Sequence, residues 1–181
     1  VLSLQGTVIS ESVRVAGDEL SDAISSYLKK VHNLVVGERT AEEIKIRVGS
    51  AFPDDEFDQT SMDVRGLHLL SGLPRTISIR AGDVREAMVE PLNVIVEAVK
   101  RTLERTPPEL AADIVDRGIM LAGGGALVRG ISDLISNETG ILTHVAEEPL
   151  LCVVNGCGRV LEDFKRLGRV LDASEFSRLA N

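Results

Sequence analysis

Polar and apolar residues alternate with a period of two in three stretches of this chain. Residues 1–15 alternate across Gln5 and Gly6, which predicts a hairpin. Residues 61–66 and 74–80 alternate in the same way, so we expect them to form two paired strands.

Elsewhere the apolar residues recur every three or four positions, which is the spacing of a helix buried on one face. In the longest such stretch, Asp83 and Glu86 suggest a helix cap, and Val84, Met88 and Leu92 belong to one apolar stripe. The predicted helices cover residues 17–34, the residues after Thr40, residues 82–106 and 107–118, the region near 131–140, and the residues from Pro149 onward.

The helix after Thr40 matters for the candidate site. Thr40 and Glu43 are spaced as a capping box, in which the hydroxyl and the carboxylate each accept a free backbone N–H. This spacing predicts that the Glu43 carboxylate is occupied by the cap. It also predicts that Ile44 and Val48 face inward.

The order of elements predicts the fold class. Two strands and two helices come first, two more strands follow, and helices then alternate with short strands at 119–122 and 141–146. Such an order indicates an α/β fold with a mixed sheet flanked by helices and a small inserted α+β part.

Composition and charge exclude several function classes. The 181 residues are 44% hydrophobic and 27% charged, and the net charge is −8, which argues against a nucleic-acid partner. No apolar run reaches the length of a membrane span, and no signal peptide is visible. Cys152 and Cys157 lack the spacing of a zinc or redox motif, so we expect no metal site.

Three consecutive glycines, Gly123 to Gly125, follow a short apolar strand and precede a helix. A P-loop would need Lys and Ser or Thr after a second glycine, and neither stands at the required place. A dinucleotide fingerprint would need glycine where Val128 stands. Main chain without Cβ atoms can still approach a ligand closely, so spacing alone leaves a ligand wall and a tight packing turn equally open.

Several separated stretches, in the same order, resemble the MreB family of bacterial actin-like cell-shape proteins. They are VRVAGDELSDAISSYLKK, GERTAEEIKIRVGSA, the run from DVREAMVEP to IMLAGGGALVRGI, and ETGI followed by VAEEPLLCVVNGCGRVLE. The resemblance covers nearly the whole chain, although residues 164–181 match less clearly. It implies an actin-like, ribonuclease H-like fold in which ATP binds in a cleft between two halves.

The chain resembles the second of those halves. It begins at Val1 in what reads as the middle of a strand, so we expect a piece of a longer protein. A D-x-G-x-x-T phosphate hairpin appears nowhere in the sequence. The resemblance therefore implies that the phosphate hairpins, the catalytic carboxylate and the Mg²⁺ ligands lie upstream, and that this chain carries no catalytic residue.

The resemblance also implies which residues meet the nucleotide. Gly123, Gly124, Gly125 and Ala126 would form the wall beside the adenosine, which agrees with the missing phosphate-binding Lys and Ser or Thr. In the same family the helix after GERT supplies an acidic residue and a lysine near the ribose and the base.

Two residues on that helix fit these roles. Glu42 and Lys45 are three positions apart and share one helix face, whereas Glu43 is expected to be occupied by the cap. With the resemblance, we expect Glu42 to accept hydrogen bonds from ribose hydroxyls and Lys45 to donate to the base or stack near it. The alternative is a plain Glu–Lys pair on the surface.

The resemblance further implies a smaller subdomain over residues 17–80 and a larger one formed by residues 1–16 and 81–181. It implies self-association into filaments, a membrane-anchored RodZ-like partner that meets the larger subdomain, and contact with the inner membrane through the missing half. The expected location is the cytoplasm, at the membrane.

The function expected from this resemblance is that of an ATP-binding cytoskeletal protein that forms filaments and maintains rod shape. The alternatives are half of a sugar or acetate kinase of the same superfamily, or a chaperone-like interaction module. The parent is expected to be a slow ATPase that uses Mg²⁺. The chain alone is expected to be inactive, because phosphoryl transfer needs groups from both halves.

Overall fold

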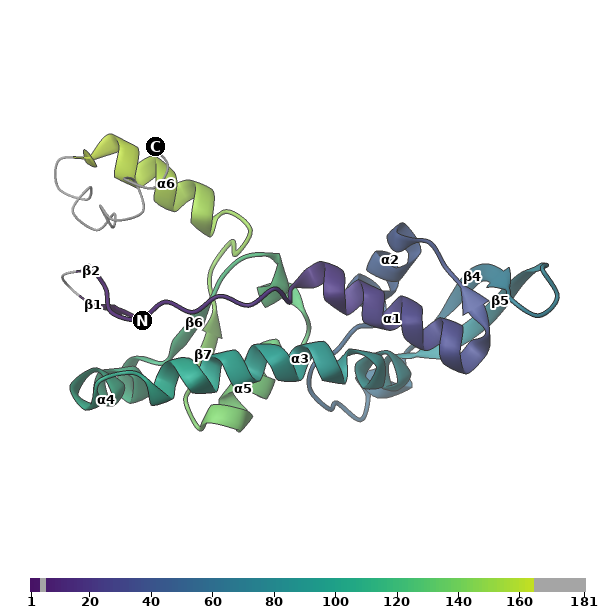
Figure 1. Ribbon diagram of the computed structural model, residues 1–181, viewed down its shortest axis with the longest axis horizontal. Coiled ribbons are helices and arrows are strands. Elements are labelled where there is room, and N and C mark those ends of the chain that lie inside the picture. The colour runs from purple at the N-terminus through teal and green to yellow at the C-terminus, as the bar shows by residue number, and fades with distance from the viewer. Residues whose placement is uncertain (4–5, 165–181) are drawn as a thin grey trace.

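The computed structural model describes residues 1–3 and 6–164 (Figure 1). Helices α1 and α3 pack against each other along the long axis of the molecule. The β4–β5 hairpin lies at one end, and α4, α6 and the N-terminal strands lie toward the other. In chain order the elements are β1 Leu2–Ser3, β2 Gly6–Thr7, α1 Gly17–His32, β3 Leu34–Val35, α2 Glu38–Val48, a 3₁₀ turn Phe57–Gln59, β4 Ser61–His68, β5 Pro74–Arg80, α3 Ala81–Glu104, α4 Pro108–Arg117, β6 Ile119–Leu121, a 3₁₀ turn Gly124–Leu127, α5 Ile131–Thr139, β7 Thr143–Val145 and α6 Cys152–Glu162.

A three-stranded sheet in the order β3-β4-β5 forms one end of the molecule. β4 and β5 pair antiparallel from Ser61 opposite Arg80 to Leu67 opposite Pro74, which confirms the two paired strands predicted from alternation. β3 pairs with β4, and the sequence did not predict it. The helix expected over 17–34 stops at His32, because Asn33 adopts a left-handed conformation with φ 51° and ends it.

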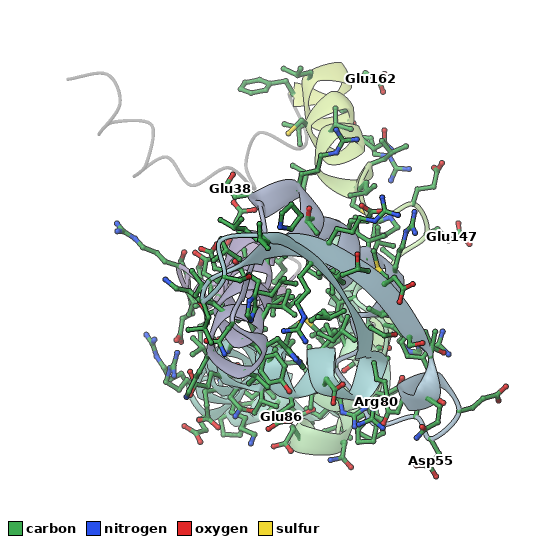
Figure 2. The ribbon with its side chains drawn as sticks, turned by 90° about the vertical axis from the view of Figure 1, so that its right-hand side faces the viewer. Glu38, Asp55, Arg80, Glu86, Glu147 and Glu162 are labelled. Carbon is green, nitrogen blue, oxygen red and sulfur yellow. The ribbon has the colours of Figure 1, made fainter. Side chains whose placement is uncertain are left out.

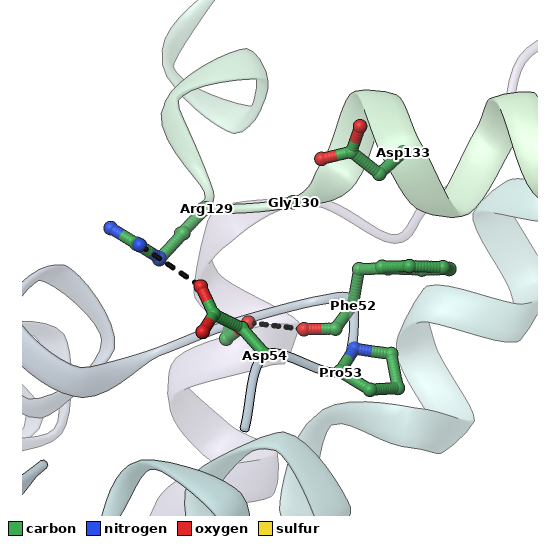
Figure 3. A pocket seen from close by; sticks show the side chains of 7 residues that line it. Phe52, Pro53, Asp54, Arg129, Gly130 and Asp133 are labelled. Atoms are coloured by element: carbon green, nitrogen blue, oxygen red, sulfur yellow. Dashed lines mark hydrogen bonds and ion pairs between the residues drawn. The ribbon is translucent and has the colours of Figure 1, made fainter. Parts of the chain in front are cut away.

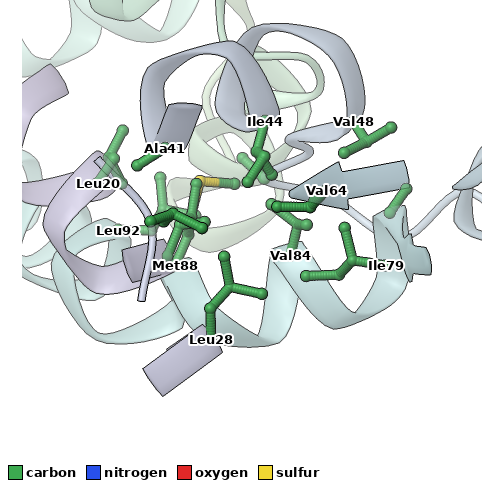
Figure 4. Packing of buried hydrophobic residues seen from close by; sticks show 14 of the residues in the cluster. Leu20, Leu28, Ala41, Ile44, Val48, Val64, Ile79, Val84, Met88 and Leu92 are labelled. Carbon is green, nitrogen blue, oxygen red and sulfur yellow. The ribbon is translucent and has the colours of Figure 1, made fainter. Parts of the chain in front are cut away.

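Helices α1, α2 and α3 and this sheet enclose a continuous hydrophobic core (Figure 4). Each of its large side chains stabilises the fold by about 1.5–3 kcal/mol relative to an exposed position. The predicted inward residues Ile44 and Val48 belong to it, being 0% and 2% exposed. The other side chains labelled in the figure are Leu20, Leu28, Ala41, Val64, Ile79, Val84, Met88 and Leu92.

The long helix α3 carries the predicted apolar stripe, but its cap differs from the prediction. The helix starts at Ala81, and Asp83 is its third residue, whose carboxylate accepts the N–H of Arg80 at 3.2 Å. Asp83 therefore caps the helix from inside its first turn and is not paired with Glu86. The stripe is deepest near its start, since Val84, Met88 and Leu92 are at most 2% exposed.

A second, parallel pair of strands lies toward the other end. β6 pairs with β7, and α5 connects them and packs on β7. This strand–turn–helix–strand order is the one predicted for residues 119–146. The N-terminal hairpin predicted over residues 1–15 is much shorter in the structure: Leu2–Ser3 and Gly6–Thr7 pair antiparallel, and residues 8–15 form no strand. Gln5 and the tail from residue 165 lie outside the described residues. No helix among the described residues has both the length and the apolar character to cross a bilayer.

Candidate functional site

The glycine turn links β6 to a short 3₁₀ helix that begins at Gly124. Gly123 has φ 83° and ψ 176°, a conformation that side-chain-bearing residues rarely adopt. Its N–H donates to the carbonyl of Pro149 at 2.8 Å, and its own carbonyl accepts the N–H of Ala126 at 3.2 Å. These bonds fix the turn beside the segment that leads into α6, so the turn is an ordered feature of the fold.

The surface above this turn is open. A Cβ atom built on Gly123 or Gly125 would meet no heavy atom within 4 Å, and one on Gly124 would lie 3.5 Å from Cδ2 of Leu150. Ala126 is 7% exposed and anchors the turn to the interior. The protein's own packing therefore does not require Gly124 and Gly125 to be glycine, and a flat ligand could approach their backbone.

Helix α2 begins earlier than expected. It starts at Glu38 after the N-cap Gly37, so Thr40 lies inside the first turn. The predicted capping box between Thr40 and Glu43 is therefore wrong. Glu43 instead pairs with Arg47, with 2.9 Å between Oε1 and the guanidinium.

Glu42 and Lys45 form a small polar network with the first turn of α1. The Lys45 ammonium lies 2.5 Å from Glu42 Oε2 and donates to the carbonyl of Gly17 at 2.8 Å. The Ser21 hydroxyl donates to the same Oε2 at 2.8 Å. The hydrogen bond from Lys45, and after it the one from Ser21, hold the pKa of the Glu42 carboxyl below its usual range.

The chain just after helix α2 is joined to the chain just after the glycine turn. Ser50, just after α2, forms a parallel bridge with Arg129, just after the glycine turn. The N–H of Ala51 donates to the Arg129 carbonyl at 2.7 Å. Among the described residues, no hydrogen bond joins Glu42 or Lys45 to Gly123, Gly124 or Gly125, so this bridge is the bonded link between the two predicted elements.

A shallow pocket of about 280 Å³ lies beside this bridge (Figure 3). Arg129 is one of its lining residues, and its guanidinium contacts Asp54 at 3.1 Å and lies over the Phe57 ring at 4.1 Å. None of the residues predicted to bind a ligand lines this pocket. Its lining residues are Ser50, Phe52, Pro53, Asp54, Arg129, Gly130 and Asp133.

The acidic loop between Phe52 and Ser61 supplies ion pairs. Asp54 accepts the Phe57 N–H at 3.0 Å and pairs with Arg129, and these contacts, the backbone bond first, lower the pKa of its carboxyl. Asp58 pairs with Arg85 of α3. In residues 1–3 and 6–164, no cluster of three or more His, Cys, Asp or Glu side chains is arranged to hold a metal ion.

Ser21 was not singled out by sequence reasoning. The sequence feature that could have identified it is a polar residue on the inner face of α1, three positions before Ile24 and seven before Leu28. Ser21 is 8% exposed, and a buried hydroxyl needs a hydrogen-bond partner. In the sequence alone that partner cannot be identified, because it lies on another helix.

Comparison with known proteins identifies relatives over nearly the whole chain. The profile of the MreB/Mbl protein family matches residues 1–169. The cell shape-determining protein Mbl of Bacillus subtilis is 46% identical over 167 residues, covering 92% of this chain and 50% of the relative. The cell shape-determining protein MreB of Escherichia coli is 48% identical over 162 residues, covering 90% and 46%. The chain thus spans about half the length of the curated relatives it matches.

Solved structures agree with this assignment and with an actin-like α/β fold. MreB5 of Spiroplasma citri bound to ADP superposes with a TM-score of 0.83 at 34% identity, over 88% of this chain and 48% of that one. The same protein bound to AMPPNP gives a TM-score of 0.82. The MamK double helical filament shares the fold, with a TM-score of 0.70 at 18% identity over 90% of this chain and 50% of that one.

Proposed function

Because the chain belongs to the MreB/Mbl family, we propose that it supplies the adenosine side of the nucleotide site in a filament-forming cell-shape protein. The observation that carries this proposal is the open backbone of Gly123 to Gly125, tied through the Ser50–Arg129 bridge to the helix that bears Glu42. The ADP and AMPPNP bound to the Spiroplasma citri relative support a nucleotide as the ligand.

In this proposal the nucleoside lies against the glycine turn. Gly123, Gly124, Gly125 and Ala126 form a wall without projecting side chains. Glu42 Oε2 is occupied by Lys45 and Ser21, which leaves Oε1 to accept a hydrogen bond from a ribose hydroxyl. Lys45 uses two of its three N–H donors on protein oxygens, and the third is assigned to the base.

The proposal assigns the triphosphate and its Mg²⁺ to groups outside the chain. The glycine turn presents an uncharged surface and carries no lysine or hydroxyl for a phosphate. ATP hydrolysis, slow in the parent protein, would accordingly require residues beyond this chain, as would contact with the inner membrane. We assign residues 17–80 to the smaller subdomain, and residues 1–16 and 81–181 to the larger one that meets a RodZ-like partner in the cytoplasm.

Self-association into filaments is supported by the unlike surfaces at the two ends of the molecule. The end of β4 and the turn that follows it expose Leu67, Leu69, Leu70 and Leu73, which are 48%, 45%, 79% and 63% exposed. From Val64 to Gly82 every ionisable side chain is Arg or His, although the whole chain carries a charge of −8. Figure 2 looks onto this end.

Helix α4 lies toward the opposite end and bears exposed acidic side chains at Glu109, Asp113 and Asp116. Its Val115 is also 62% exposed. A basic, leucine-rich surface can therefore meet an acidic one on the next copy, and a head-to-tail contact between unlike surfaces generates an open chain of subunits.

The experiment that tests the proposed function is light scattering of the full-length gene product with and without ATP and Mg²⁺. Nucleotide-dependent scattering, with filaments in electron micrographs, is the expected result. Release of ADP that depends on a sugar or acetate, without any assembly, would instead identify a phosphotransferase. Nucleotide binding that alters capture of unfolded clients, again without assembly, would identify a chaperone-like module.

A further inference from the structure

We propose that Ser21 is a positioning residue, whose hydroxyl orients the Glu42 carboxylate and thereby sets selectivity for the ribose of the nucleotide. This inference rests on the proposed function, because it assumes that Glu42 faces the ribose. It adds a residue on a different helix, α1, and a specific consequence for ligand choice.

The geometry directs the Ser21 hydroxyl to the carboxylate. Oγ lies 2.8 Å from Glu42 Oε2 and 3.2 Å from the carbonyl of Gly17 in its own helix. A hydroxyl has a single hydrogen, and the shorter contact to a charged acceptor is the stronger one. Ser21 is itself 8% exposed, so water competes little for that hydrogen.

Two donors from different places converge on one carboxylate oxygen. Lys45 approaches Oε2 from α2 itself, and Ser21 approaches it from α1. Among the described residues Oε1 has no hydrogen-bond partner, and the Glu42 side chain is 46% exposed. One oxygen is therefore held by the protein, while the other is presented to a ligand.

The lysine alone would not fix this arrangement. Lys45 is itself held in place, since its side chain is 10% exposed and donates to the Gly17 carbonyl, but a single donor to Oε2 leaves the carboxylate plane free to turn about that contact. A second donor on a packed helix restricts the carboxylate plane before the ligand arrives. A preorganised acceptor loses less entropy on binding and discriminates more sharply against a ligand that lacks the matching hydroxyl.

The test compares ribonucleotides with deoxyribonucleotides on the full-length gene product. Dissociation constants for ATP, 2′-deoxyATP and 3′-deoxyATP are measured by calorimetry for the wild type, Ser21→Ala and Ser25→Ala. Ser25 is a matched control: it lies one turn further along α1, and within the described chain its side chain makes no hydrogen bond. The wild type and Ser25→Ala should prefer ATP over at least one deoxynucleotide.

In Ser21→Ala that preference should fall about fivefold, which corresponds to one hydrogen bond of about 1 kcal/mol. Affinity for the disfavoured deoxynucleotide should stay within about twofold of the wild type, since its missing hydroxyl makes no contact to lose. An equal loss for all three nucleotides would indicate a purely structural role and overturn the inference. An unchanged preference would overturn it as well.

Glu42→Gln separates failure of this inference from failure of the proposed function. If Glu42→Gln loses the ribose preference and Ser21→Ala keeps it, the positioning role is wrong and the ribose contact stands. If Glu42→Gln keeps the preference, the ribose contact itself is wrong. Should Ser21→Ala fail to fold, Ser21→Thr, which retains the hydroxyl, must keep the preference, and Ser21→Cys, a weaker donor, must lose it.

Discussion

Glu42 and Glu43 are neighbours in the sequence, but their carboxylates have different surroundings. Glu42 points toward α1 and contacts Ser21 and Lys45, whereas Glu43 pairs along the outer face of α2 with Arg47. Sequence reasoning expected Glu43 to be occupied by a cap at Thr40. The occupant is a different residue, because the helix starts two positions before Thr40.

The network around Glu42 should make stability depend on pH. Its pKa is held below the ordinary value of 4.5, first by Lys45 and then by Ser21. A carboxylate whose pKa is lowered by folding stabilises the folded state above that ordinary value, and the contribution is lost as pH falls through the folded pKa. Urea unfolding of wild type and Glu42→Gln should therefore differ by a constant free energy above about pH 5.5, and the difference should shrink below about pH 4.5. A difference that stays constant down to pH 3 would contradict this.

The three glycines of the turn should respond differently to alanine. Gly123→Ala places a side chain at φ 83°, which should destabilise the protein by about 1–3 kcal/mol. Gly124→Ala places a methyl group 3.5 Å from Leu150, an ordinary contact, and should change stability by less than about 0.5 kcal/mol. Chemical denaturation of both variants measures this, and equal losses would show that the turn is not as described.

A larger side chain at Gly124 should act on the ligand and spare the fold. Valine there would cover the open backbone proposed to face the adenosine, so we expect the dissociation constant for ATP to rise at least about tenfold. The melting temperature should remain close to that of the wild type. An unchanged affinity for ATP would mean that the glycines serve only the turn.

At the scale of elements, the apolar pattern located the helices better than it located their ends. The predicted caps at Thr40 and Asp83 differ from the observed N-caps, which are Gly37 and Arg80. Periodicity sums over many residues, whereas a cap is a local competition among several polar side chains. Thr106, just before the N-cap Pro107 of α4, shows this competition, because its hydroxyl donates back to the Thr102 carbonyl of α3 at 2.8 Å.

Among the strands, too, the long elements were predictable and the short-range details were not. β4 and β5 are long enough for alternation to predict them, and they pair with each other across a short turn. β3 has two residues, and its assignment depends on hydrogen bonds to β4, more than thirty positions away. No local pattern can predict a strand of that length.

The leucine-rich turn of the β4–β5 hairpin should affect assembly more than folding. Leu70 is 79% exposed, so Leu70→Asp should change the free energy of unfolding by less than about 0.5 kcal/mol. If the turn contacts the next subunit, the same change should raise the critical concentration for assembly about tenfold or more, because a buried leucine contributes about 1.5–3 kcal/mol.

Leu70→Ala serves as the matched variant, since it shortens the side chain without adding charge. Its critical concentration should lie between those of the wild type and Leu70→Asp. Sedimentation of the full-length gene product measures all three proteins. Unchanged assembly in Leu70→Asp would remove this turn from the filament contact.

At the scale of the whole molecule, our proposal gives the chain one side of a nucleotide site. In that proposal the glycine turn is the wall for the nucleoside, Glu42 is the acceptor for the ribose, and the phosphates are assigned to residues outside the chain. Calorimetry on the 181-residue chain should therefore show ATP binding weaker than micromolar and no hydrolysis, because phosphoryl transfer needs positioned charges around the γ-phosphate. Micromolar or tighter affinity would contradict this expectation.

The fold class was predictable from the order of elements and from several separated stretches of sequence that resemble one family. The contacts that build the candidate site were not. Ser21 meets Glu42, and Ala51 meets Arg129, across long separations in the chain. Packing in three dimensions creates such contacts, and neither periodicity nor local spacing records them.

The short bridge between Ser50 and Arg129 couples the segment after α2 to the segment after the glycine turn. If the part bearing α2 rotates when a ligand leaves, the turn bearing the glycines must follow, or the hydrogen bond from Ala51 must break. Hydrogen–deuterium exchange at the Ala51 amide would then report whether the segment after α2 and the segment after the glycine turn move as one rigid body or separate.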